Sequence, residues 1–177
     1  MDGNFYIDCK PPFPVNTVTT TTLTTSNQNI WPSSHLPLLG GYFNYPGKLL
    51  YMRGWGVCTS GATPGNFGIN FFWGNNTANN GTNLSNVSYT WTASQTNTSF
   101  SFELWVRCRA TGVSGQVFSY GNVFVAGSGV IHHPFNGATN NVTIDTTLNN
   151  YISPQVNRSG STAETITPYH IFTQSLN

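Results

Sequence analysis

The segment 99–110, SFSFELWVRCRA, constrains the fold more than any other part of the chain because apolar residues recur at every second position. Successive side chains of a β-strand point to opposite faces of the sheet, so this period of two predicts a strand with one buried face. The predicted buried side carries Phe100, Phe102, Leu104, Val106 and Cys108. The opposite side carries Trp105, Arg107 and Arg109 among otherwise polar residues.

A second β-rich run follows this strand and completes a hairpin. Residues 111–115, TGVSG, contain two glycines, which can take the positive φ that a tight reversal needs. Residues 116–126 are rich in Val and Phe. We therefore predict a long antiparallel hairpin with a loop of about four or five residues, which places the fold in the β class.

The rest of the chain contains further β-rich segments separated by Gly, Pro and Asn turns, and it shows no convincing helix and no internal repeat. Pro168 predicts that the last segment lies at a sheet edge or carries a bulge. We expect about eight strands in two packed antiparallel sheets, an all-β, jelly-roll-like β-sandwich. Outside the hairpin, the predicted strands are residues 48–59, 66–74, 87–93, 139–151 and 162–175.

Residues 1–45 differ from the rest of the chain, which divides it into an N-terminal arm (1–45) and a sandwich body (46–177). The arm contains five prolines and many large apolar residues without a period of 2 or 3.6, although residues 15–25 are compatible with one strand. Such a segment must bury its apolar side chains on something else. We expect an extended arm that grips a neighbouring copy; the alternative is a loop wrapped over its own domain.

The scarcity of charge excludes several classes of function. Charged residues make up 6% of the chain and the net charge is +1, against roughly 25% charged residues in an ordinary soluble protein. Without a basic run, binding to nucleic acid or to a membrane through a basic helix is excluded. We also expect no membrane span and no signal peptide. A surface so poor in charge favours burial against a neighbouring subunit, because few ions lose their hydration.

The titratable residues form no recognisable catalytic or metal-binding motif. The five acids are Asp2, Asp8, Glu103, Asp145 and Glu164, and none makes an obvious pair. No G-x-S-x-G motif is present. His132 and His133, in a predicted loop, are the only metal-like pair, and the three cysteines are expected to be free thiols. We therefore predict a non-enzymatic protein with no catalytic residue, no metal and no cofactor.

Two interpretations apply to the polar side of the strand 99–110. Trp105, Arg107 and Arg109 are covered by the arm or a loop of the same chain, or they form part of a subunit interface. Trp and Arg are enriched at the centres of protein interfaces, so these three residues are candidates for a subunit interface.

The central region resembles small structural proteins of tailed-phage particles. The resemblance lies in FELWVRCRATGVSGQVFSYG, an aromatic strand with an Arg that passes through a Gly-x-Ser-Gly turn into a strand ending in Gly. The upstream run KLLYMRGWGVCTSGATPGNFGINFFWG resembles the matching earlier part, with its Arg-x-x-Gly element and its Thr/Pro/Gly turn. The resemblance as a whole spans roughly residues 46–126.

This resemblance implies a virion protein with a β-sandwich body, often trimeric, and no catalytic residues. We expect a capsid decoration (cement) protein: a homotrimer made in the host cytoplasm that binds the major capsid protein on the capsid exterior. The alternative is a receptor- or carbohydrate-binding head of a phage fibre or tail; a hydrolase lacks its constellation of residues. The candidate assembly interface comprises Phe13, Trp31, Leu38, Phe43, Trp105, Arg107 and Arg109.

Overall fold

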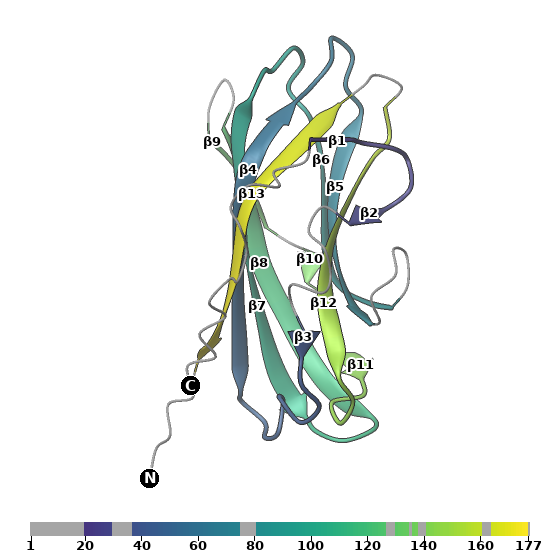
Figure 1. Ribbon diagram of the computed structural model, residues 1–177, viewed down its shortest axis with the longest axis vertical. Coiled ribbons are helices and arrows are strands. Elements are labelled where there is room, and N and C mark those ends of the chain that lie inside the picture. The colour runs from purple at the N-terminus through teal and green to yellow at the C-terminus, as the bar shows by residue number, and fades with distance from the viewer. Residues whose placement is uncertain are drawn as a thin grey trace.

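The protein is an all-β sandwich in the computed structural model, which describes residues 20–29, 37–74, 81–126, 130–134, 136–137, 141–160 and 164–176 (Figure 1). For residues 37, 130–134 and 136–137 only the backbone is described. The strands are β1 (Thr21–Thr22), β2 (Gln28–Asn29), β3 (Pro37–Leu38), β4 (Leu49–Thr59), β5 (Asn66–Gly74), β6 (Thr82–Thr90), β7 (Thr98–Ala110), β8 (Gly115–Ala126), β9 (Val130–Pro134), β10 (Asn136–Gly137), β11 (Val142–Ile144), β12 (Asn150–Arg158) and β13 (Thr165–Leu176).

Two antiparallel sheets face each other across the core (Figure 1). The seven-stranded sheet has the order β1-β13-β4-β7-β8-β11, with β9 also paired to β8. The six-stranded sheet has the order β10-β6-β5-β12-β2, with β3 also paired to β12. The predicted hairpin is confirmed as β7 and β8, and the loop between Ala110 and Gly115 contains Gly112 at a φ of 107°.

The order of the strands is that of a jelly roll. In chain order, the eight framework strands are β1, β2, β4, β5, β6, β7, β12 and β13. In the seven-stranded sheet the neighbours are β1, β13, β4 and β7, which are the first, eighth, third and sixth framework strands. In the six-stranded sheet they are β2, β12, β5 and β6, which are the second, seventh, fourth and fifth. This interleaving is the product of two Greek keys. Strands β8, β9 and β11 extend the seven-stranded sheet beyond β7, and this widens one face of the sandwich.

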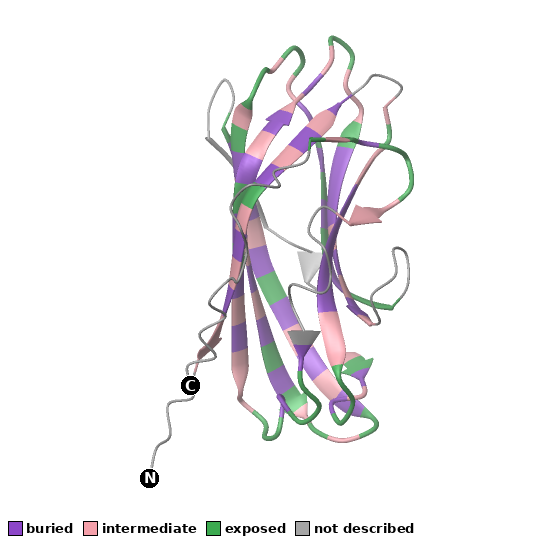
Figure 2. Cartoon of the chain, in the orientation of Figure 1, coloured by how far each residue is buried: buried purple, intermediate pink, exposed green. Residues whose placement is uncertain are grey.

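The core lies between the sheets and is filled by the alternate residues of each long strand, as the alternating bands of Figure 2 show. Phe100 and Phe102 of β7 are buried there. The two glycines that flank Trp55 on β4 make room for their rings: a Cβ on Gly54 would lie 2.5 Å from Phe102, and one on Gly56 would lie 2.8 Å from Phe100. A side chain at Gly54 would therefore displace the ring of Phe102, and one at Gly56 would also clash with the backbone carbonyl of Thr167 on β13.

The sandwich begins earlier in the chain than residue 46. Leu23, Leu38, Tyr42 and Phe43 are buried in the core, and β1, β2 and β3 pair with strands of the body. These parts of the predicted arm belong to the sandwich. Residues 1–19 and 30–36 lie outside the described residues.

The later part of the chain differs from the predicted strands in two places. The predicted strand 139–151 is replaced by β11 and by β12, a central strand of the six-stranded sheet. Pro154 has no N–H group to donate, but β12 tolerates it. On the edge of β12 that faces away from β5, Pro154 lies in the gap between the residues that pair with β3 and those that pair with β2. The bulge predicted at Pro168 is confirmed by the register shift between Pro168 and His170.

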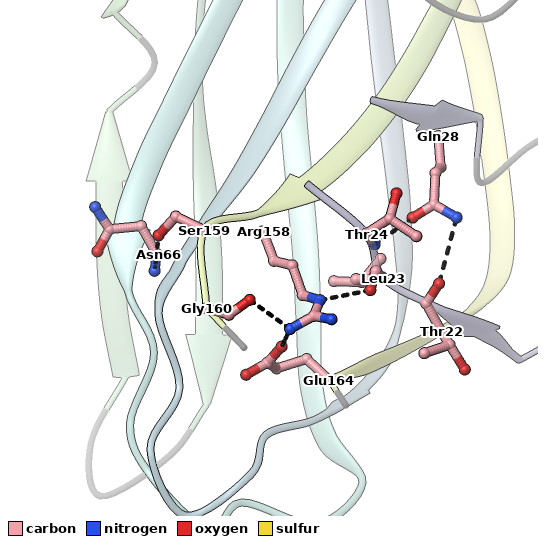
Figure 3. Close-up of polar contacts among 9 residues, drawn as sticks. All are labelled: Thr22, Leu23, Thr24, Gln28, Asn66, Arg158, Ser159, Gly160 and Glu164. Atoms are coloured by element: carbon pink, nitrogen blue, oxygen red, sulfur yellow. Dashed lines mark hydrogen bonds and ion pairs between the residues drawn. The ribbon is translucent and has the colours of Figure 1, made fainter. Parts of the chain in front are cut away.

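An ion pair ties the N-terminal strands to the end of the sandwich (Figure 3). Arg158 Nη1 lies 3.0 Å from Glu164 Oε2, and the two side chains are only 16% and 1% exposed. Arg158 Nε donates to the carbonyl of Leu23 at 2.5 Å, and Nη1 donates to the carbonyl of Gly160 at 2.5 Å. The backbone N–H of Leu23 donates to the carbonyl of Glu164. One guanidinium therefore joins β12, the segment after β1 and the start of β13.

Replacing Glu164 by Ala should lower the free energy of unfolding by about 3–5 kcal/mol, because it leaves the Arg158 guanidinium buried without its carboxylate. The matched control is Glu103→Ala, which breaks a pair with Arg53, a side chain that is 47% exposed. The Glu103→Ala substitution should lower the free energy of unfolding by about 1–2 kcal/mol, which is the sum expected for one exposed ion pair and one hydrogen bond. Urea denaturation measures both, and equal losses would contradict this account.

Candidate functional site

The outer face of the seven-stranded sheet is covered by aromatic side chains. The residues that alternate with the core residues of its four long strands point away from the core. We call this surface the aromatic face and define it by seven residues of β4, β7, β8 and β13: Tyr51, Trp55, Trp105, Phe118, Tyr120, His170 and Phe172.

The rings of the aromatic face contact one another across the strands. Tyr51 pairs in register with Trp105, and Trp105 with Tyr120. The ring centroids of Tyr51 and Trp105 are 5.0 Å apart, and those of Trp105 and Tyr120 are 5.4 Å apart with only 5° between the ring planes. Phe172 extends the row to β13, with its ring 5.7 Å from that of Tyr51. Cross-strand contacts of this kind stabilise the sheet and hold the rings in fixed positions.

A second group of rings lies toward the bulge of β13. Trp55 lies 4.7 Å from His170 and 6.4 Å from Phe172, measured between ring centroids. Trp55, which lies next to the Phe172 end of the row, is 38% exposed, and Tyr120, at the other end, is 43% exposed. A contiguous exposed aromatic surface on a rigid sheet is typical of an interaction site.

The charges in the middle of the aromatic face are already paired. Arg53 Nε lies 3.7 Å from Glu103 Oε1, which also accepts a hydrogen bond of 2.8 Å from the hydroxyl of Tyr51. Burial, followed by the hydrogen bond to the Glu103 carboxylate, raises the pKa of Tyr51 to about 12. The phenol is therefore neutral at ordinary pH, and this surface can be covered without stranding an unpaired charge.

Two cations lie at one end of the aromatic face. Arg107 and Arg109 are exposed near the end of β7, where Arg107 pairs with Leu49 of β4. Among the described residues, no carboxylate forms an ion pair with either arginine. Lys48, which precedes Leu49 in the chain, has its ammonium group 4.6 Å from the centroid of the Tyr42 ring. The face therefore has an aromatic centre in which the charges are paired, and a positively charged end.

The predicted interface residues fall into three groups. Trp105, Arg107 and Arg109 lie on the outer side of β7, as the alternation predicted. Leu38 and Phe43 are buried in the core of their own domain, so they do not belong to the surface that the described residues present. Phe13 and Trp31 lie outside the described residues.

The sequence analysis missed most of the aromatic face. Tyr51 and Trp55 lie in residues 48–59, a run with apolar residues on both sides. This pattern predicts a strand covered on two sides, but it does not show what covers the outer side. Phe118, Tyr120 and Phe172 alternate with core residues of their strands, and this was the signal that could have identified them.

A second exposed apolar surface lies where three loops meet at one end of the sandwich. The backbone N–H of Gly41 donates to the carbonyl of Thr146, and that of Gly112 donates to the hydroxyl of Thr146, so the loops are joined. Leu39, Val113 and Leu148 are 73%, 74% and 59% exposed on these loops. We call these three residues the loop end.

The remaining titratable residues do not form a reactive site within the part of the chain that the structure describes. No group of three or more His, Cys, Asp or Glu residues in that part could hold a metal ion. Cys58 and Cys108 are buried free thiols, and burial raises the pKa of both, that of Cys58 to about 12. A thiol with a raised pKa is a poor nucleophile. The backbone of His132 and His133 belongs to β9 rather than to a loop.

Neither a scan of protein-family models nor a search of curated protein sequences finds a match to this chain. In the described residues, no helix is long and apolar enough to cross a membrane. Function must therefore be inferred from the aromatic face and the loop end.

Proposed function

We propose that the protein is a non-enzymatic structural component of a phage particle, a decoration (cement) protein that stabilises the outer surface of the capsid. The observation that carries this proposal is the aromatic face, a rigid, nearly neutral surface across four strands of a jelly roll. The resemblance of residues 46–126 to phage structural proteins supports it.

In this proposal the aromatic face joins copies of the chain into a homotrimer. Trp55 and Tyr120 are the exposed anchors, and aromatic residues dominate the energetics of protein interfaces. The Arg53–Glu103 pair is buried as a pair when subunits meet, which costs less than burying either charge without its partner.

The loop end is the proposed contact with the major capsid protein. Its exposed Leu and Val side chains can bury apolar area against a flat surface. Three copies in one trimer engage the shell together, and this multivalency raises the effective affinity above that of one contact.

A receptor- or carbohydrate-binding head of a fibre or tail is the second candidate. Exposed aromatic rings on a rigid sheet, Trp55 above all, are also suited to stacking against the apolar faces of sugar rings. A glycan array separates the two candidates: a decoration protein binds none of the glycans, whereas a receptor-binding head binds a defined set, and binding is lost in Trp55→Ala.

Replacing Tyr120 by Glu should dissociate the trimer into monomers, because it places an unpaired carboxylate in the aromatic contact between subunits, from which water is excluded. The matched control is Thr90→Glu on β6, an exposed residue of the opposite sheet, which should leave the trimer intact. Light scattering after size exclusion gives the mass of each, and circular dichroism verifies the fold. Trimers from both variants would exclude the aromatic face as the subunit interface.

Replacing Leu39, Val113 and Leu148 together by Ser should leave the mass in solution unchanged and weaken binding to capsids at least tenfold. The assay is co-sedimentation with shells of the phage that encodes the chain. The control is Ser88→Glu on the outer side of β6. Undiminished binding by the triple variant would show that the loop end does not contact the shell.

A further inference from the structure

The acidic residues of the chain leave two carboxylates without an assigned role. The chain has five Asp and Glu residues in all. Glu103 pairs with Arg53, and Glu164 pairs with Arg158. Asp145 accepts hydrogen bonds from the N–H and the hydroxyl of Thr147 at 2.8 and 2.6 Å. The two that remain, Asp2 and Asp8, both belong to residues 1–19, whose one basic side chain is Lys10, so the side chains of this segment carry a net charge of −1.

The aromatic face has the complementary charge. Arg107 and Arg109 are exposed at its end, and no carboxylate of the described residues pairs with them. The chain has a net charge of +1 and only six Lys and Arg residues. Two arginines on the same side of one strand therefore form a strong local positive charge on this sheet. A segment that carries carboxylates would pair with this end of the face.

Residues 1–19 also match the apolar part of the face. They include Phe5, Tyr6, Ile7 and Phe13, which need an apolar surface to cover them. Pro11, Pro12 and Pro14 have no N–H group, so this part of the segment cannot complete a regular sheet ladder and is suited to side-chain contacts.

The segment is also long enough to cross an aromatic face. Thr20 lies at the outer edge of the seven-stranded sheet, with its hydroxyl 2.8 Å from that of Thr167 on β13. About 12 extended residues from Thr20 to Asp8 span roughly 40 Å. Crossing the face lengthwise, from Thr167 to the level of Leu176 and Arg107, takes roughly 30 Å at about 3.3 Å per residue.

We propose that residues 1–19 of one subunit lie across the aromatic face of the neighbouring subunit, with Asp2 and Asp8 at Arg107 and Arg109. This inference rests on the proposed self-association and names the segment that produces it. An arm folded onto its own face would cover the aromatic rings and remove the apolar surface that joins the subunits. An arm passed to the neighbour in a closed ring instead covers every face once.

Charge exchange between full-length chains tests this arrangement. The arm variant is Asp2→Arg with Asp8→Arg, and the face variant is Arg107→Glu with Arg109→Glu. Each variant alone places like charges together, so we expect its subunit dissociation constant to rise at least tenfold. In an equal mixture, two of the three arm–face contacts of a mixed trimer pair opposite charges, whereas a trimer of either variant alone has none, so association should recover in part. Light scattering measures the masses, and circular dichroism verifies that each variant is folded.

The controls assign each failure to one claim. A chain with all four substitutions should associate like the wild type. If that chain associates but the mixture associates no better than either double variant alone, the arm lies on its own face and the inference is overturned. If each double variant keeps the wild-type mass, the arm does not use these arginines; the inference then fails while self-association stands. A wild-type monomer would overturn both the inference and the proposed function.

Discussion

The structure depends on one constraint, that the central strands of the seven-stranded sheet carry aromatic side chains on the outer face as well as on the face that lines the core. On β7, Phe102 points into the sandwich core and Trp105 points outward into the row of rings from Tyr51 to Tyr120. The inner face needs the six-stranded sheet to cover it. The outer face, at its most exposed points, has no cover within the described residues. A sheet of this kind is built to be covered twice, once by its own domain and once by another surface.

The chain contains few charged residues, and the two ion pairs of its described part have different physical roles. The pair of Arg158 and Glu164 is buried, and it holds the early strands against the end of the sandwich. The pair of Arg53 and Glu103 lies on the aromatic face and neutralises its centre. The former gives stability that a single substitution removes, whereas the latter keeps a surface neutral enough to be buried between molecules.

The sequence predicts those parts of the molecule whose signal is local. The hairpin of β7 and β8 follows from alternation along one strand, and the bulge at Pro168 follows from the missing N–H group. Strand β12 could not be predicted, because Ser153 and Gln155 are polar yet buried beside the N-terminal strand β2, where Ser153 donates to Asn29. The aromatic face required pairing across four strands, so only its β7 residue, Trp105, was found.

The central claim is that the aromatic face is buried in the assembled protein, and hydroxyl-radical footprinting tests it most directly. Trp55 and Tyr120 are 38% and 43% exposed in the single chain. In solution at assembled concentration, both side chains should be oxidised several-fold more slowly than in a dilute, dissociated sample, while Leu148 at the loop end should react equally in both. Equal oxidation of Trp55 and Tyr120 in the two samples would contradict the claim.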